Sequence, residues 1–210
     1  SCRQSAHVLH CLANQSVPRE RYEIIWVEYY NQLSECLKNK LRSDCPAASA
    51  RAVDIAAVLE MPPGLCYHKH MMLNAGLMLA RGQIVCFADS DAMMRRTFVE
   101  SILNAFDENG DIVLHFDEVR NSDSRFYPFN NPPLREITGV GSINWLNGKP
   151  TGLLDRSDLL HMRNYGACMA ALRSSLIGIG GSDMHMDYLG HVCGFYEMTW
   201  RLVNAGKRER

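Results

Sequence analysis

Two aspartates one residue apart, Asp89 and Asp91, follow an apolar run, 82–88, that is predicted to be a buried strand. In an open α/β sheet, ligands bind at the carboxyl ends of the strands. Carboxylates in that place can hold a hard divalent cation, Mg²⁺ or Mn²⁺, and the cation can bind a diphosphate. The same triplet is common in turns, where it only caps the next helix. By itself the triplet leaves both interpretations open.

A second group of side chains that can do chemistry lies in the segment 183–197. It contains three carboxylates and two imidazoles: Asp183, His185, Asp187, His191 and Glu197. A carboxylate or an imidazole can take the proton of an attacking hydroxyl group, so this segment is a candidate for general base catalysis. A solvated turn carboxylate is the alternative interpretation of Asp187.

The histidines do not form a zinc motif. His68 and His70 are two residues apart in a predicted helix, where side chains at that spacing point in different directions. His185 and His191 lack the four-residue spacing of a helical zinc pair. The pattern favours carboxylate ligands, with His191 as the one histidine that joins Asp91 around Mg²⁺ or Mn²⁺.

The elements that must position these residues alternate between strands and helices. The predicted strands are 22–30, 53–59, 82–88 and 112–116. The predicted helices are 5–13, 31–41, 68–81, 97–106 and 196–204. Such alternation is typical of the α/β class, here a mostly parallel twisted sheet with helices on both faces.

About forty residues, 121–160, show no clear secondary-structure pattern and are rich in proline and glycine. A stretch of this length inside a compact domain usually serves a site or a lid, so we expect an irregular active-site loop region here. We expect residues 1–210 to form a single domain around one core, because the length is in the ordinary range for a domain.

Composition excludes several classes of protein. With 47% hydrophobic and 21% charged residues the chain is not disordered, and its net charge of −1 argues against sequence-independent nucleic-acid binding. No apolar run approaches the ~18 residues of a membrane span, and residues 1–15 lack the apolar stretch of a signal peptide. The 8 cysteines form no CxxC pair. We therefore expect reduced thiols and an intracellular compartment.

Several segments in a fixed order resemble the family-2 glycosyltransferases of the GT-A fold. The first is K69-xxxx-N74-A75-G76, followed by R81-G82 and by F87-x-D89-x-D91. The segment YEIIWVE (22–28) is similar to the family's second strand, and IGGSD (179–183) is similar to its "GGFD" motif. The segments 197–202 (EMTWRL) and 204–206 (NAG) resemble its last helix. Together these matches extend from about residue 5 to 206.

The resemblance implies a site for a nucleotide-diphospho-sugar donor. Asp89 and Asp91 would hold the donor through Mg²⁺ or Mn²⁺, and Lys69 would contact its phosphates. Glu28, at a strand end, would accept a hydrogen bond from the nucleotide base. Asn74 and Gly76 would serve packing and the close approach of the backbone to the nucleotide. An ordinary solvated lysine remains the alternative for Lys69, and a helix cap or surface charge the alternative for Glu28.

Two departures from the family pattern concern the beginning of the chain and the catalytic base. The family opens with a strand of the type VSVIIP, which is missing here, so we expect an N-terminally truncated domain. Family members carry Glu-Asp before the last helix, where this chain has Gly194 and Phe195. Asp187 lies where the family binds its acceptor and is the first candidate for the base. Glu197, the second candidate catalytic carboxylate, matches an acidic position of the family that has a structural part.

The resemblance thus implies transfer of a sugar to a hydroxyl group on a saccharide or lipid-linked acceptor, with inversion at the anomeric carbon. It also implies a place in the cytoplasm, at the inner face of the membrane if the acceptor is a lipid. Two alternatives belong to other classes of protein. One is a nucleotide-sugar-binding domain without catalysis, and the other is a nucleotidyltransferase, which would release pyrophosphate.

Overall fold

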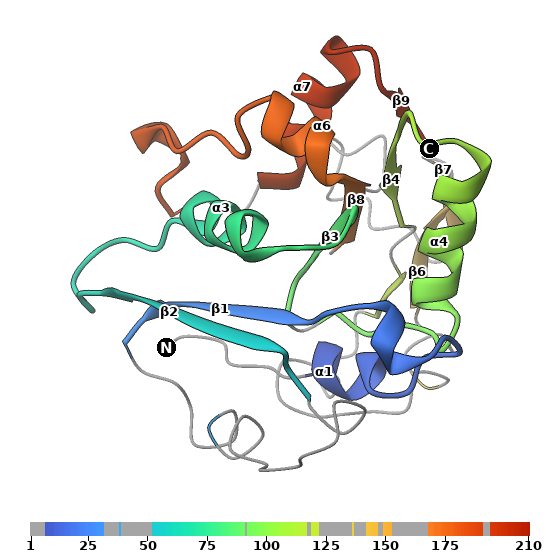
Figure 1. Cartoon of the computed structure of the whole chain (residues 1–210), viewed down its shortest axis with the longest axis horizontal. Helices are drawn as coiled ribbons and strands as arrows, with labels where there is room; N and C mark the ends of the chain where they lie inside the picture. Colours follow the sequence, from blue (N-terminus) through green and yellow to red (C-terminus); the bar gives the residue numbers. More distant parts are fainter. Residues whose placement is uncertain are drawn as a thin grey trace.

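The computed structural model describes residues 7–31, 38, 52–90, 92–116, 119–121, 136, 142–146, 149–152, 168–190 and 194–210 (Figure 1). The longer helices are α3 (Lys69–Leu79), α4 (Phe98–Glu108) and α7 (Gly194–Asn204), and the shorter ones are α1 (His7–Leu12) and α6 (Arg173–Gly178). Two 3₁₀ turns, η1 (Arg19–Arg21) and η4 (Met186–Tyr188), complete the helical elements in these ranges.

The strands form three sheets. The pair β1 (Ile25–Tyr30) and β2 (Ile55–Met61) is parallel. The central sheet has the order β3-β8-β4-β9, with bounds Ile84–Ala88, Cys168–Leu172, Ile112–His115 and Arg208–Glu209. The third sheet is antiparallel and contains β5 (Val119–Asn121), β6 (Ser142–Leu146) and β7 (Lys149–Gly152).

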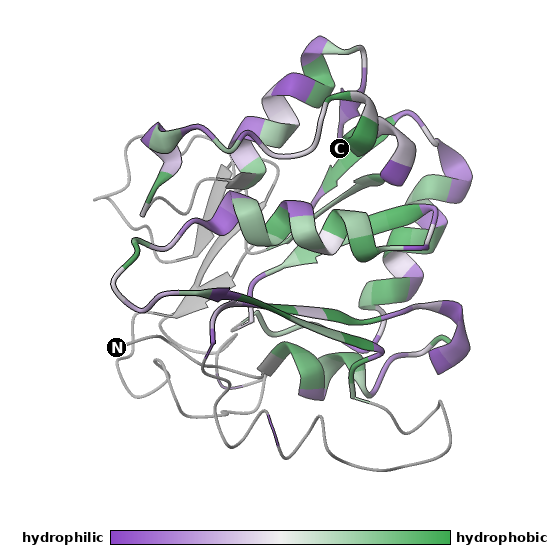
Figure 2. Ribbon diagram, turned by 60° about the vertical axis from the view of Figure 1, so that its left-hand side comes forward, coloured by the Kyte–Doolittle hydropathy of each residue, from purple (hydrophilic) through white to green (hydrophobic). Residues whose placement is uncertain are grey.

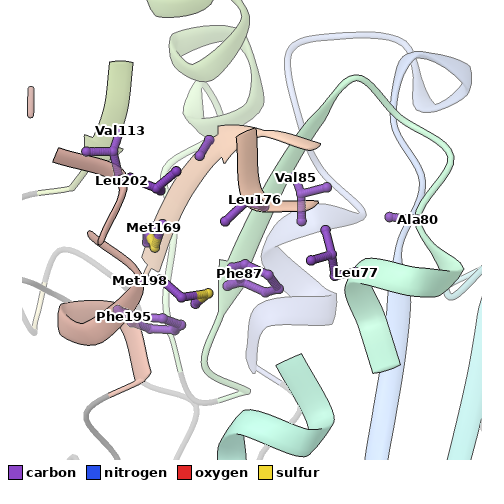
Figure 3. Close-up of a cluster of buried hydrophobic side chains, with 11 residues drawn as sticks. Leu77, Ala80, Val85, Phe87, Val113, Met169, Leu176, Phe195, Met198 and Leu202 are labelled. Atoms are coloured by element: carbon purple, nitrogen blue, oxygen red, sulfur yellow. The ribbon is translucent and has the colours of Figure 1, made fainter. Parts of the chain in front are cut away.

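The central sheet carries helices on both faces, because the side chains of its strands alternate between them. One face packs against α3, α6 and α7 in a cluster that includes Val85 and Phe87. The other face packs against α4, with Ile84 and Cys86 of the same strand. Figure 3 shows Phe87 between Leu77 of α3 and Met198 of α7. In Figure 2 the hydrophobic residues concentrate on the central strands and the hydrophilic ones on the outer turns.

The predicted α/β class is confirmed, with mixed strand pairing. β1 and β2 are parallel as expected, whereas β8 lies antiparallel between β3 and β4. Short apolar strands carry no mark of their direction, so the alternation of elements could not identify this strand as reversed. Because β3 and β4 both oppose β8, they still run in the same direction.

The segment 121–160, which was expected to be irregular, contains the strands β6 and β7. The other predicted strands and helices agree with the observed elements to within a few residues. The exception is the helix predicted over 31–41, nearly all of which lies outside the described residues. In the described ranges, Cys11, Cys66, Cys86 and Cys168 are thiols and not disulfides. No helix among the described residues has the length and apolar character needed to cross a membrane.

Candidate functional site

Lys69 and Asp89 meet at the carboxyl end of β3. Lys69 is the first residue of α3 and is only 8% exposed, and its Nζ lies 2.5 Å from the Asp89 Oδ1. The ammonium group also lies over the ring of Phe195, 4.4 Å from its centroid. A nearly buried ammonium held by a carboxylate and an aromatic face is a specific arrangement rather than a solvated lysine. The strand end therefore presents a fixed cation and a carboxylate together.

Asp89 is the one predicted metal ligand that the described residues contain. Its side chain is 36% exposed, and carboxylate oxygens suit Mg²⁺ and Mn²⁺. Asp91 and His191 lie outside the described residues. Within the ranges that the structure describes, no three His, Cys, Asp or Glu side chains group closely enough to hold a metal ion. The donor chemistry of Asp89 fits such a cation, and Asp91 and His191 remain predicted ligands.

Glu28 lies near the end of β1, as the sequence predicted, and its carboxylate is largely withdrawn from water. The Trp26 Nε1–H donates a hydrogen bond of 2.8 Å to the Glu28 Oε1. Burial raises the pKa of Glu28, and the hydrogen bond from Trp26 offsets part of that rise. A partly buried acceptor of this kind can receive a hydrogen bond from a ligand at little cost in further desolvation.

Asn74 holds the glycine-containing loop that follows α6. Its side-chain amide donates to the Ser182 O and accepts from the Ser182 N–H, each at 2.7 Å. Gly181 has φ +73°, and a Cβ there would collide with the Asn74 Oδ1. Glycine is required at this position both by the backbone conformation and by the space. The role of Asn74 in the described residues is thus to fix the loop 179–183 against α3.

Glu197 and Arg201, one turn apart on α7, brace the same loop from the other side. The Glu197 Oε1 pairs with the Arg201 Nε, and its Oε2 accepts from the Asp183 N–H at 3.2 Å. The Arg201 guanidinium also donates to the carbonyl oxygens of Ile179 and Gly181. Both oxygens of Glu197 are therefore engaged, which agrees with the structural part that the resemblance implied. The four-residue spacing in the sequence was a signal for this ion pair.

His68 and His70 contact one segment, although the helical spacing predicted divergent rings. Their ring centroids are 5.7 Å apart. The His68 Nε2 lies 3.3 Å from the Met184 O, and the His70 Nδ1 lies 2.5 Å from the Asp183 O. The prediction was wrong because His68 is the N-cap of α3 with extended backbone, φ −126° and ψ 93°, so the rule for residues inside a helix does not apply. No local signal would have revealed these contacts.

Asp187 lies in η4 and is strongly exposed. Its side chain is 86% exposed, and its Oδ2 is 3.3 Å from the His185 Nδ1. The neighbouring Tyr188 stacks on His70, with ring centroids 4.5 Å apart. The structure therefore joins Asp187 to α3 through the next residue in the chain. An exposed carboxylate can reach a ligand arriving from solvent.

Comparison with known proteins identifies a family. The family model described as Glycosyl transferase family 2 matches residues 69–179. Among solved structures, the chain is similar to "Crystal structure of S. aureus TarS 1-349", with a TM-score of 0.53 and 15% sequence identity. The match covers 87% of this chain and 49% of that one, so the chain spans about half the length of that structure. No curated protein matches the sequence.

Proposed function

The chain belongs to glycosyl transferase family 2, and we propose that it transfers a sugar from a nucleotide-diphospho-sugar donor to a hydroxyl acceptor at the carboxyl end of β3. The observation that carries this proposal is the contact between Lys69 and Asp89. It presents a cation for phosphate oxygens beside a carboxylate for a metal ion, at the end of a sheet strand where ligands bind in α/β folds.

On the donor side, Lys69 binds the diphosphate as a point charge and Glu28 accepts a hydrogen bond from the nucleotide base. Asp89, together with Asp91 and His191, would hold Mg²⁺ or Mn²⁺. When bound, this cation offsets the negative charge that develops on the leaving diphosphate. Asn74 contributes by holding the loop 179–183 close to the start of α3.

On the acceptor side, Asp187 is the general base. The acceptor oxygen attacks the anomeric carbon from the face opposite the diphosphate, and its proton passes to the Asp187 carboxylate. The bond between the anomeric carbon and the diphosphate oxygen breaks in the same displacement, so the configuration inverts. Glu197 acts as a positioning residue, since both of its oxygens are occupied by Arg201 and the Asp183 N–H. The acceptor is a saccharide or a lipid-linked sugar, and the reaction takes place on the cytoplasmic side.

Thermal shift with nucleotides tests the donor site. We expect UDP or GDP and the corresponding nucleotide sugars to raise the melting temperature in the presence of Mn²⁺, because a ligand of the native state stabilises it by mass action. The shift should disappear in Asp89→Ala and in Asp91→Ala. Asp111→Ala removes an exposed aspartate and is the matched control that keeps the shift. No shift with any nucleotide would overturn the proposal.

Product analysis then separates the three activities. Release of a nucleoside diphosphate supports sugar transfer, release of pyrophosphate a nucleotidyltransferase, and binding without either product a non-catalytic domain. Asp187→Asn should lower turnover by about 10²–10⁴-fold, the range for loss of a general base, while nucleotide binding persists. Unchanged turnover would remove Asp187 from this role.

A further inference from the structure

Residues 67–70 hold a turn that lies more than a hundred positions later in the chain, residues 183–190. The Gly190 N–H donates to the Tyr67 O at 2.7 Å, and the His68 Nε2 lies 3.3 Å from the Met184 O. Because a carbonyl oxygen only accepts, His68 must carry a proton on Nε2 in this contact. His68 is only 4% exposed, so water competes little for the hydrogen bond.

His70 contributes both a hydrogen bond and a ring contact. Its Nδ1 donates to the Asp183 O at 2.5 Å, and its ring stacks on Tyr188 with an interplanar angle of 22°. The side chain is fully buried, and the Nε2 has no hydrogen-bond partner in the described part of the chain. A second proton on Nε2 would be a buried N–H without an acceptor, so the neutral ring is the form that fits.

Lys69, between the two histidines, reaches in another direction to Asp89. Consecutive side chains therefore serve different parts of the molecule. The ammonium group contacts the strand end of the proposed donor site, whereas the two imidazoles contact the turn that carries Asp187. Three adjacent residues at the start of one helix thereby connect those two parts.

We propose that His68 and His70 are positioning residues for the acceptor half of the reaction. They hold the turn 183–190, and with it Asp187, in a fixed place relative to Lys69 and Asp89. This inference rests on the proposed function, which assigns Asp187 as the base and Lys69 to the diphosphate. Such a role has consequences for rate because a misplacement of about 1 Å can cost on the order of 10²-fold in turnover.

Hydrogen–deuterium exchange tests the hold on the turn directly. The amides of Tyr188 and Leu189 are hydrogen-bonded within the turn, and the amide of Gly190 is hydrogen-bonded to the Tyr67 O. We expect them to exchange at least ten-fold faster in His70→Leu, and to stay within about three-fold of wild type in His70→Asn, whose amide N–H can replace the Nδ1 donor. Ile102→Ala, a cavity variant in α4 on the other face of the sheet, is the control for general destabilisation.

Equal acceleration in Ile102→Ala and His70→Leu would show a global effect and overturn the inference. So would unchanged exchange in His70→Leu. His68→Leu should affect the same amides in the same direction, since its contact with the Met184 O supports the turn independently.

Kinetics test the link to catalysis. With water as the acceptor, we expect the release of UDP from UDP-glucose, or of GDP from GDP-mannose, to fall at least ten-fold in kcat in His70→Leu. The KM for the donor should stay within two-fold, and His70→Asn should recover most of the rate. A rise in the KM for the donor as large as the fall in kcat would overturn the positioning role. A wild-type chain that binds and cleaves no nucleotide sugar would overturn the proposed function, and with it the catalytic part of this inference, whereas the exchange result stands on its own.

Discussion

Lys69 and Lys207 each place an ammonium group against an aspartate, but in different surroundings. The side chains of Lys69 and Asp89 are 10% and 36% exposed, whereas those of Lys207 and Asp111 are 22% and 71% exposed. Exposed pairs contribute little to stability because water screens both charges. At the scale of single residues, the two pairs therefore make the same type of contact, but the pair of Lys69 with Asp89 is less screened by water.

Lys69→Gln should lower both stability and nucleotide binding. It leaves the Asp89 carboxylate without its cation, which we expect to cost about 1–3 kcal/mol, less than the full value for a buried pair because Asp89 is partly exposed. Binding of the nucleoside diphosphate should weaken at least ten-fold, as measured by calorimetry. In Lys207→Gln, the matched control, melting temperature and nucleotide affinity should be unchanged. Equal behaviour of the two variants would contradict the role of Lys69.

The raised pKa of Glu28 predicts that the stability of the fold changes with pH in one direction. Because burial raises its pKa in the folded state, the folded chain binds this proton more tightly than the unfolded chain does. The carboxyl group then destabilises the fold as the pH rises through its ordinary value of 4.5 and beyond. Glu28→Gln should consequently melt higher than wild type at pH 7 but not at pH 3.5, in thermal melts at both values.

The same variant should bind nucleoside diphosphates more weakly by about ten-fold, the size of one lost hydrogen bond to a charged group. A Glu28→Gln variant that binds as tightly as wild type would argue against contact between Glu28 and the nucleotide base.

At the scale of elements, the loop 179–183 is held by two helices that do not adjoin it in the sequence, α3 and α7. Asn74 of α3 holds Ser182 by two hydrogen bonds, and Arg201 of α7 donates to the carbonyl oxygens of Ile179 and Gly181. α6 ends where this loop begins. Two helices from different parts of the chain thus determine its conformation.

Substitutions at two adjacent glycines in this loop distinguish the cost of backbone strain from the cost of a steric collision. Gly180 and Gly181 both have positive φ, +83° and +73°. A Cβ at Gly180 meets no atom within 4 Å in the described part of the chain, whereas a Cβ at Gly181 collides with Asn74. Gly180→Ala should cost about 1 kcal/mol from the left-handed conformation alone. Gly181→Ala should cost a further 1–3 kcal/mol or so, because the hydrogen bonds of Asn74 must shift. Chemical denaturation would measure both, and equal losses would contradict this account.

At the scale of the whole molecule, the central sheet and the helices on its two faces carry the stability, while the proposed chemistry lies at the sheet's edge. Met169 on β8 is fully buried between the layers, and Met186 in η4 is 70% exposed. The core can therefore be perturbed separately from the surface turn that carries Asp187.

Met169→Ala should destabilise the fold by about 2–5 kcal/mol, the range for a large-to-small change in a core, whereas Met186→Ala should change it by less than about 0.5 kcal/mol. Melting curves without ligand give both values. The nucleotide-induced shift should persist in Met169→Ala below its lowered melting temperature, because Met169 is a core residue of β8 with no proposed role in ligand binding. Loss of the shift in the still-folded variant would show that core and site are coupled.

The local features of this protein follow from residues that are close together in the sequence. Apolar runs and periodicity identified β1 to β4 and the helices α1, α3, α4 and α7, because the spacing of apolar residues shows which side of an element is buried. The position of Asp89 directly after an apolar strand, and the basic and amide residues before it, identified the end of the sheet where a donor site belongs.

Which distant segments meet is known only from the folded chain. The antiparallel insertion of β8 between β3 and β4, and the contact of His68 and His70 with the turn 183–190, join residues from more than fifty to well over a hundred positions apart. No local pattern specifies such contacts, because they depend on the packing of the whole core. The contacts of the two histidines depend also on the extended backbone of His68, where the helix begins. The elements follow from nearby residues, but their pairing follows from the sum of long-range contacts.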